Sequence, residues 1–170
     1  MDYSRKEKIK ILFLPTSYFK FIAGEEEYLK DIPDSVTDII VAGEQLIISQ
    51  QLKRYLKESG LYLHNHYGPS EAHAVSTYTI QPAEEIPQLP PIGKPISNCR
   101  LYIGQMDKIT GEISLVPKGI VGQLFIGGQP VGRGYHNRPQ LTEEKFMVDP
   151  YQREERLYKT GDLARWLEDG

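Results

Sequence analysis

Short apolar runs alternate with amphipathic stretches along the first 80 residues of the chain. Continuous apolar runs of strand length predict strands over Ile9–Leu14 and Thr37–Ala42, and a third short strand is predicted over Leu61–Asn65, leading into the first polar motif. Helical spacing of apolar positions predicts two helices, over Tyr18–Leu29 and Leu46–Glu58, and Gly60 is the expected end of the second. Strands that alternate with helices are typical of βαβ units, so this part of the chain is predicted to form a largely parallel sheet.

The pattern changes after residue 80. Five prolines fall between Gln81 and Pro95, which excludes a helix interior or a central strand there. We therefore interpret residues 81–98 as a crossing between an α/β part, residues 1–80, and a β-rich part, residues 99–170. Short strands separated by turns predict an antiparallel, barrel-like sheet in the second part, with strands over Arg100–Gly104, Gly122–Gly127, Arg156–Thr160 and Leu163–Leu167.

The β-rich part contains one predicted helix and ends at a turn signal. The helix is expected near Leu141–Phe146, with Thr142 as its cap. Residues Glu168–Gly170 have the composition of a hairpin turn, and they follow the alternating strand pattern of Leu163–Leu167. No partner strand follows in this sequence, so we expect the chain to be a truncated piece of a longer domain.

The composition is that of an ordinary globular protein, with 39% hydrophobic residues, 25% charged residues and a net charge of −3. No basic run predicts binding to nucleic acid or to an anionic membrane, and no apolar run approaches the ~18 residues of a membrane span. The single cysteine, Cys99, excludes an internal disulfide and lies in an apolar run, so we interpret it as a buried structural thiol. These features favour a cytoplasmic protein.

The first of three polar motifs is Asn65–Glu71, which follows a predicted strand. Tyr67 could stack on a planar base, and Gly68 would let the backbone approach a ligand closely. Ser70 offers a hydroxyl to an anionic oxygen, and Glu71 supplies an oxygen ligand for Mg²⁺. The alternative is a surface turn with a buried tyrosine and a solvated glutamate. A zinc site is not favoured, because the neighbouring histidines lack a standard spacing of zinc ligands.

The two other motifs lie in the β-rich part. Gly122–Gly128, continued by Gly132–Pro139, is rich in glycine and carries few groups suited to chemistry, so we interpret it as architectural. Its glycine spacing is not that of a dinucleotide fingerprint. In Tyr158–Asp162, the carboxylate of Asp162 follows a glycine at a strand end, where it could accept hydrogen bonds from two ribose hydroxyls. The alternative is a turn aspartate that bonds its own backbone.

In this order and with these gaps, the three motifs resemble those of the adenylation domains of nonribosomal peptide synthetases, within the superfamily of adenylate-forming enzymes. The resemblance extends from near Ile9 to the last residue. It implies the α/β and barrel-like parts of that fold, with a nucleotide site at their seam. The implied nucleotide contacts are Asn65 and the backbone of His66 at the adenine amino group, Tyr67 stacked on the adenine with Gly68 beside it, Ser70 at the α-phosphate, Glu71 on Mg²⁺ and Asp162 on the ribose.

The same resemblance implies part of an amino-acid pocket, which is apolar with one titratable group. Its lining would be Phe13, Ile40, Ala42, His66, Ala74 and Val75. His66 would either hydrogen-bond a polar substrate or only pack beside the tyrosine loop. Phe13 and Ile40 could equally serve core packing, and both roles can hold at once. The family's pocket aspartate is not found in these residues, so the amino acid cannot be identified.

The resemblance implies that an amino acid is activated with ATP to an aminoacyl-adenylate and transferred to the phosphopantetheine thiol of a carrier domain. Carrier and condensation domains of an antibiotic or other secondary-metabolite assembly line are the implied partners. The family's phosphate loop and its catalytic lysine are not found here, so we assign no catalytic residue and expect the chain alone to be inactive. One alternative is an acyl- or aryl-CoA synthetase, but the sequence of Arg133–Phe146 resembles the peptide-synthetase version of this segment and argues against it. The other alternative is a noncatalytic module derived from such an enzyme.

Overall fold

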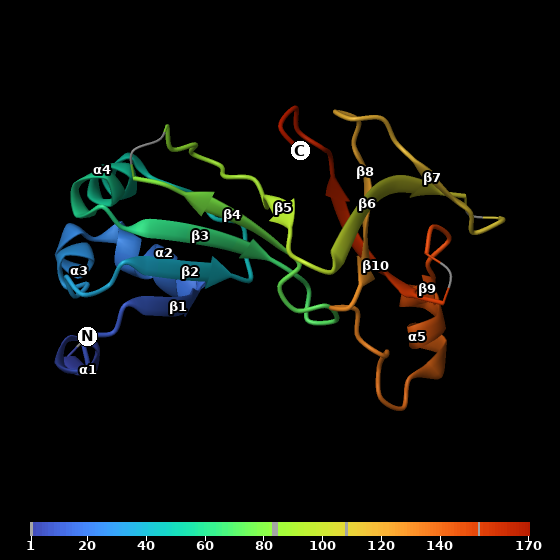
Figure 1. The fold of residues 1–170 in the computed structure, drawn as a ribbon, viewed down its shortest axis with the longest axis horizontal. Helices are drawn as coiled ribbons and strands as arrows, with labels where there is room; N and C mark the ends of the chain where they lie inside the picture. The colour runs from blue at the N-terminus through green and yellow to red at the C-terminus, as the bar shows by residue number, and fades with distance from the viewer. Residues whose placement is uncertain (1, 83–84, 108, 153) are drawn as a thin grey trace. The chain divides into compact units, whose positions relative to one another are not determined.

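The computed structural model describes residues 2–82, 85–107, 109–152 and 154–170. The chain divides into two compact units (Figure 1). The first unit comprises Met1–Tyr67 and Ser76–Lys94, and the second comprises Gly68–Val75 and Pro95–Gly170. Each unit contains most of one five-stranded sheet. Of the predicted crossing, residues 83–84 lie outside the described part of the chain.

The first sheet has the strand order β1-β2-β3-β4-β5. Its strands are β1 (Ile11–Pro15), β2 (Asp38–Ala42), β3 (Tyr62–Tyr67), β4 (Ser76–Ile80) and β5 (Lys94–Pro95). The first three are parallel to one another, and β4 is antiparallel to β3. The prediction of a largely parallel sheet is therefore confirmed, while the additional strands β4 and β5 were not predicted.

The first unit also contains helices α1 (Asp2–Lys6), α2 (Thr16–Gly24), α3 (Glu26–Lys30) and α4 (Gln50–Ser59). The single helix predicted over Tyr18–Leu29 is wrong, because Glu25 has an extended backbone with φ −124° and ψ 131° that separates α2 from α3. Gly24 precedes this break, and glycine stabilises a helix poorly because its unfolded backbone is so free. No described helix of the chain is both long and apolar enough to cross a membrane.

Helix α4 begins later than its apolar pattern predicts. Leu46 and Ile48 are buried but lie outside the helix, so the predicted start at Leu46 is wrong. Ser49 caps the helix, because its Oγ accepts a hydrogen bond of 3.1 Å from the backbone N–H of Leu52. Gly60 ends the helix in the left-handed conformation with φ 70°, as predicted.

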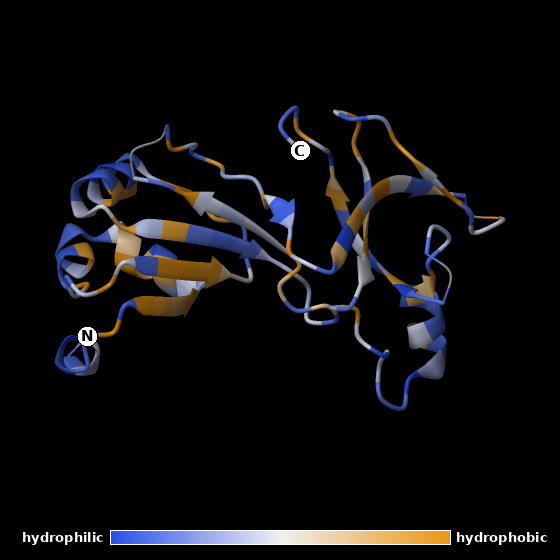
Figure 2. Cartoon of the chain, in the orientation of Figure 1, coloured by the Kyte–Doolittle hydropathy of each residue, from blue (hydrophilic) through white to orange (hydrophobic). Residues whose placement is uncertain are grey.

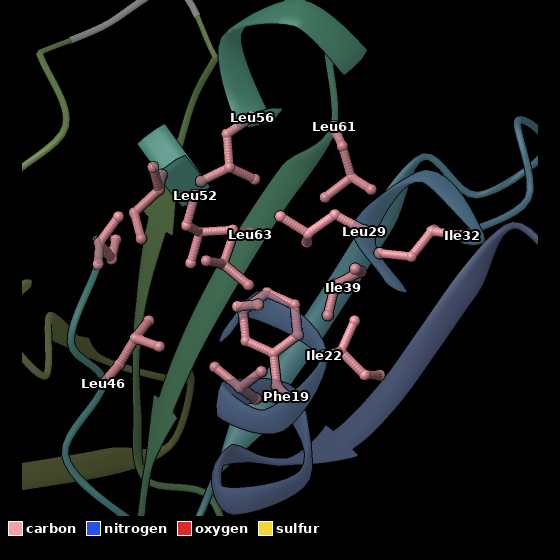
Figure 3. Packing of buried hydrophobic residues seen from close by; sticks show 14 of the residues in the cluster. Phe19, Ile22, Leu29, Ile32, Ile39, Leu46, Leu52, Leu56, Leu61 and Leu63 are labelled. Atoms are coloured by element: carbon pink, nitrogen blue, oxygen red, sulfur yellow. The ribbon is translucent and has the colours of Figure 1, made fainter. Parts of the chain in front are cut away.

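The core of the first unit lies between α2, α3, α4 and one face of the first sheet. Figure 3 shows Phe19 and Leu52 packed toward the sheet residues Ile39 and Leu63. These four side chains are at most 1% exposed. Because side chains alternate along a strand, the neighbours of Ile39 point to the opposite face. Strands β1 and β2 are mostly hydrophobic along their length (Figure 2), so both faces of this edge of the sheet carry apolar side chains.

The second sheet has the strand order β7-β6-β8-β10-β9. Its strands are β6 (Cys99–Met106), β7 (Ile113–Leu115), β8 (Gly122–Gly128), β9 (Phe146–Val148) and β10 (Arg156–Ala164). All four strand pairings are antiparallel, and the sheet curls into a half-barrel (Figure 1), which confirms the predicted antiparallel, barrel-like part. The strand predicted over Leu163–Leu167 is wrong beyond Ala164, where β10 ends.

Helix α5 (Pro139–Lys145) connects the glycine-rich motif to β9. The prediction that Thr142 caps this helix is wrong, because Thr142 lies inside it and Pro139 occupies the first turn. The Oγ1 of Thr142 instead donates to the carbonyl of Arg138 at 2.9 Å and accepts from the N–H of Tyr135 at 2.9 Å. The predicted burial of Cys99 is confirmed, and burial raises the pKa of its thiol to about 11.

Candidate functional site

The motif Asn65–Glu71 runs from the end of β3 into a tight turn. The N–H of Ala72 donates to the carbonyl of Pro69 at 3.0 Å, which places Ser70 and Glu71 at the turn. Gly68 allows the loop to fold back on itself, because a Cβ at this position would lie 1.5 Å from the carbonyl oxygen of His73. The glycine is therefore required by close packing of backbone against backbone, a cause that the sequence motif does not reveal.

Glu71 is half-buried and contacts the glycine-rich motif twice. Its Oε1 accepts a hydrogen bond from the Tyr135 hydroxyl at 2.5 Å, and its carbonyl oxygen accepts one from the N–H of Gly132 at 2.8 Å. The hydrogen bond from Tyr135 is the main cause that lowers the pKa of the Glu71 carboxyl. Glu71 therefore stays ionised near neutral pH, which is the form that binds a hard cation.

The donor set around Glu71 fits Mg²⁺ only together with a nucleotide. Among the described residues, no group of three or more His, Cys, Asp or Glu side chains is placed to hold a metal ion. Mg²⁺ is commonly bound through one or two carboxylates, with substrate phosphates and water supplying the other oxygens. A single ionised glutamate beside a hydroxyl residue, Ser70, satisfies that pattern.

Two further aromatic residues support this carboxylate. The Tyr135 ring packs edge-on against Phe146 with 5.5 Å between the ring centroids, and Phe146 packs against Tyr158 at 4.9 Å. Tyr158 is 5% exposed, and after Tyr135 it is a smaller cause of the lowered pKa of the Glu71 carboxyl. Burial raises the pKa of Tyr158, so its hydroxyl keeps its proton and remains a donor. Neither tyrosine was assigned a role from the sequence.

Asp162 lies at an irregularity in β10. The pairing of β10 with β8 shifts register between Lys159 and Leu163. Within this interval, the Oγ1 of Thr160 donates to the carbonyl of Leu124 at 2.7 Å and accepts from the N–H of Asp162 at 2.9 Å. Irregularities of this kind redirect side chains and are frequent beside binding sites. The carboxylate of Asp162 is thus presented on an exposed residue of a fixed backbone.

Asn65 is buried and joins the proline-rich segment to the sheet. It is 5% exposed, and its Nδ2 donates to the carbonyl of Pro91 at 2.9 Å. A neighbouring contact on β4 has the same form, since the Oγ of Ser76 donates to the carbonyl of Ile92 at 2.8 Å. Sequence reasoning missed both contacts because the acceptors lie in a segment without a regular pattern.

Four of the predicted pocket residues share one face of the first sheet. Phe13 pairs in register with Ile40, and Ala42 pairs with His66. All four alternate with residues of the core, such as the fully buried Val41, so their side chains lie on the opposite face. Phe13 is 61% exposed, so the alternative that it serves core packing is wrong for this structure. Ile40 is only partly exposed.

The remaining predicted pocket residues, Ala74 and Val75, belong to the second unit. Val75 is fully buried, and its carbonyl accepts a hydrogen bond from the N–H of Ile96 at 3.0 Å. Ala74 is partly exposed, and its N–H donates to the Nδ1 of the preceding His73 at 2.7 Å. These contacts fix the segment that leads from the turn at Glu71 back into β4.

A histidine of the sheet face was not selected from the sequence. The Nε2 of His64 lies 2.8 Å from an Asp38 carboxylate oxygen, and its Nδ1 lies 3.0 Å from the hydroxyl of Thr79. Hydrogen bonds from Thr37 and then from His64 lower the pKa of Asp38. The signal was available, because His64 and His66 are two residues apart in a strand and therefore share a face.

Comparison with known proteins identifies the family of the chain. The family described as "AMP-binding enzyme" matches residues 1–136, so the chain belongs to this family. The chain is 54% identical over 169 residues to gramicidin S synthase 2 of Brevibacillus brevis and 51% identical over 168 residues to tyrocidine synthase 2 of Brevibacillus parabrevis. Each alignment covers 99% of this chain but only 4% of the relative.

Solved structures show the same fold. The N-terminal subdomain of NpsA from Klebsiella oxytoca, in complex with 3-hydroxybenzoyl-AMSN, superposes with a TM-score of 0.77 at 25% identity and covers 98% of this chain and 39% of that chain. NpsA-ThdA from the same organism, an artificially fused adenylation–PCP di-domain, gives a TM-score of 0.77 at 27% identity, over 99% of this chain and 30% of that one. The chain therefore has the fold of part of an adenylation N-terminal subdomain, as predicted.

Proposed function

We propose that the protein containing this chain activates an amino acid with ATP and passes it to a carrier domain. A carboxylate oxygen of the amino acid attacks the α-phosphorus of ATP, the bond from that phosphorus to the bridging oxygen of the β-phosphate breaks, and pyrophosphate leaves. The phosphopantetheine thiol then attacks the acyl carbon, loses its proton and releases AMP. The observation that carries this proposal is the ionised Glu71 held in a turn directly after Tyr67, in a chain 54% identical to gramicidin S synthase 2.

The nucleotide would be held by the residues of the first and third motifs. Tyr67 would stack on the adenine, with Asn65, the backbone of His66 and Gly68 beside it. Ser70 would contact the α-phosphate, and Asp162 would accept from the ribose hydroxyls. Mg²⁺, when bound at Glu71, would offset the negative charge on the phosphate oxygens.

The amino acid would contact the face of the first sheet that lies opposite the core. Phe13, Ile40, Ala42 and His66 share that face, and Ala74 and Val75 would complete the lining. The set is mostly apolar, so it would hold a side chain by burial and leave His66 as the group that selects polarity.

A multidomain assembly line is the setting that the relatives support. Two relatives are named as synthases of gramicidin S and of tyrocidine, and a solved relative is an adenylation–PCP di-domain. We infer a carrier domain and condensation domains as partners, antibiotic or secondary-metabolite synthesis as the process, and the cytoplasm as the location. Neither nucleic acid nor membrane is proposed as a partner.

Exchange of labelled pyrophosphate into ATP, measured with the whole protein, tests this proposal. A panel of amino acids, aryl acids and fatty acids is the appropriate substrate set, because the solved NpsA subdomain binds an aryl compound. We expect exchange with one or a few amino acids. Exchange with aryl or fatty acids alone would indicate an acyl- or aryl-CoA synthetase, and exchange with no acid would indicate a noncatalytic module.

A charge-neutral substitution provides the matched control. Glu71→Gln keeps the size of the side chain but removes the charge that would bind Mg²⁺, so exchange is expected to fall by at least about tenfold. Glu112→Gln makes the same change on an exposed residue of the second unit and is expected to leave exchange unchanged. Equal effects of both substitutions would contradict the role given to Glu71.

A further inference from the structure

The glycine-rich motif, which the sequence presents as architectural, reaches the carboxylate of Glu71. We propose that Tyr135, assisted by Tyr158, is a positioning residue that orients the Glu71 carboxylate toward the metal–nucleotide complex. This inference rests on the proposed function and extends it to two residues outside the first motif. Neither tyrosine is assigned a contact with substrate.

The hydrogen bond from Tyr135 leaves acceptor sites on the Glu71 carboxylate for a metal ion. The Tyr135 hydroxyl donates to Oε1 at 2.5 Å. A carboxylate offers about four acceptor sites on its two oxygens, so donors from two tyrosines do not exhaust it. The hydroxyls therefore restrict the rotation of the carboxylate while lone pairs remain available for a cation.

The charge of the side chain that hydrogen-bonds to Glu71 also affects how well Glu71 can bind a cation. An arginine or lysine at this distance would pair with Glu71 and compete with Mg²⁺ for its charge, whereas a phenol is neutral and leaves the full negative charge. The positive charge of Lys145 has only a small effect on Glu71, and its ammonium lies 3.2 Å from a carboxylate oxygen of Glu144. The hydrogen bond from the Tyr135 phenol thus holds the Glu71 carboxylate without neutralising its charge.

Tyr135 is held rigidly enough to orient another group. Its N–H donates to the hydroxyl of Thr142 in α5 at 2.9 Å, and its ring packs against Phe146. Gly134 has φ 127°, and a Cβ there would lie 2.4 Å from the Thr142 methyl, so only glycine lets the loop approach α5 this closely. The phenol is therefore anchored through its backbone and through its ring.

The backbone of Glu71 is fixed from the same motif. The N–H of Gly132 donates to the Glu71 carbonyl at 2.8 Å, and a Cβ on Gly132 would lie 2.8 Å from that oxygen. Tyr158 opens the motif that ends at Asp162, and its ring packs against Phe146 beside Tyr135, from where it also lowers the pKa of the Glu71 carboxyl. Residues of all three motifs therefore meet at one carboxylate, as expected where outer hydrogen bonds orient a metal ligand.

The test measures metal binding in addition to turnover, using the whole protein and Mn²⁺ as a paramagnetic substitute for Mg²⁺. Electron paramagnetic resonance reports the affinity of Mn²⁺ for the protein–ATP complex, and calorimetry in EDTA reports ATP binding without metal. Tyr135→Phe is expected to weaken Mn²⁺ binding by about tenfold, the scale of lost outer hydrogen bonds to metal ligands, and to leave metal-free ATP binding unchanged.

Tyr151→Phe is the matched control. It also removes a tyrosine hydroxyl of the second unit, but one that donates to the carbonyl of Ile113 at 2.8 Å. This variant is expected to bind Mn²⁺ like the unsubstituted protein. Thermal unfolding of each variant separates a loss of folding from a loss of metal binding, and Tyr158→Phe provides a second variant should Tyr135→Phe fold poorly.

Substitution of Glu71 shows whether the tyrosine acts through it. In a Glu71→Gln background, Tyr135→Phe should weaken Mn²⁺ binding no further, because the group that it orients has lost its charge. The inference would be overturned if Tyr135→Phe weakened Mn²⁺ binding by the same factor with and without Glu71→Gln. It would also be overturned if both Tyr135→Phe and Tyr158→Phe bound Mn²⁺ as tightly as the unsubstituted protein. If Glu71→Gln weakens Mn²⁺ binding and the tyrosine variants do not, only the positioning role fails. If the unsubstituted protein binds no ATP, the proposed function fails with it.

Discussion

Gly68 is the residue of the first motif for which the structure gives the most specific requirement. A Cβ at this position would lie 1.5 Å from the carbonyl oxygen of His73 and 2.5 Å from its carbonyl carbon. Both atoms are backbone, so a side chain cannot be accommodated by rotation of a neighbour. The loop itself would have to move.

Gly68→Ala is therefore expected to destabilise the protein by about 1–3 kcal/mol, the range for overpacking a closely packed site. Gly24→Ala is the control, because nothing lies within 4 Å of a Cβ at that position. Unfolding in urea measures both free energies. An unchanged stability of Gly68→Ala would show that the turn is free to open, which the close backbone contact argues against.

At the residue scale, sequence motifs reveal groups that carry chemistry but not the groups that support them. Glu71 was selected from the sequence as an oxygen ligand for Mg²⁺, and Asp162 was selected as a carboxylate that follows a glycine at a strand end. Tyr135 was not selected, because its contact with Glu71 joins residues 64 positions apart. The hydrogen bond from Asn65 to Pro91 was missed for the same reason, since local patterns do not encode such pairings.

Helix α4 shows how one side chain determines where an element begins. The apolar residues Leu46 and Ile48 continue the helical pattern, but Ser49 has an extended backbone with φ −71° and ψ 163° and caps the helix. An N-cap serine satisfies a backbone N–H that otherwise has no partner in the first turn. The cap therefore separates a buried extended segment from the helix.

Ser49→Ala is expected to lower the free energy of unfolding by about 1 kcal/mol, because it removes the acceptor for the Leu52 N–H. Ser49→Asp should retain the stability, since aspartate is an equally good N-cap and its charge suits the helix N-terminus. Thermal unfolding of the two variants measures both changes in stability. A loss of the same size in both would mean that the serine contributes through packing rather than through its cap.

At the element scale, continuous apolar runs predict strands well even where the strand is not buried, and strands of polar and aromatic residues are harder to predict. Strands β1 and β2 were predicted because their runs are continuous, although no residue of β1 is buried. Strand β4 was missed because its three central residues, Thr77, Tyr78 and Thr79, are polar or aromatic and only partly buried. Their high β-propensity was the available signal. The break at Glu25 could not be predicted from periodicity, because the burial of Leu29 continues the pattern of α2.

For the whole molecule, the chain enters the second unit twice, first through Gly68–Val75 and again from Pro95 onward. The boundary falls inside the first motif, between Tyr67 and Gly68. The chain spans 4% of gramicidin S synthase 2 and 39% of the solved NpsA N-terminal subdomain. The sequence suggested this partial coverage through family motifs that are not found in it.

These 170 residues alone are expected to show no amino-acid-dependent pyrophosphate exchange. The expected phosphate-loop lysine and the catalytic lysine are not found in them, so the cations that stabilise the charge of the transferring phosphate are not supplied. The comparison is with the whole protein, assayed with the same amino acid. Amino-acid-dependent exchange by the 170 residues would show that the residues named here suffice for the chemistry.

The alternation of side chains along β1, β2 and β3 has a consequence for how such a protein changes over evolution. Phe13, Ile40 and His66 lie on one face of the sheet, while Ile39 and Leu63 anchor the other face in the core. Substitutions at the exposed Phe13 therefore leave the core contacts of Ile39 and Leu63 in place. Under the proposed function, a lineage could acquire a different building block by changing this face, and protein engineers could follow the same route by randomising it.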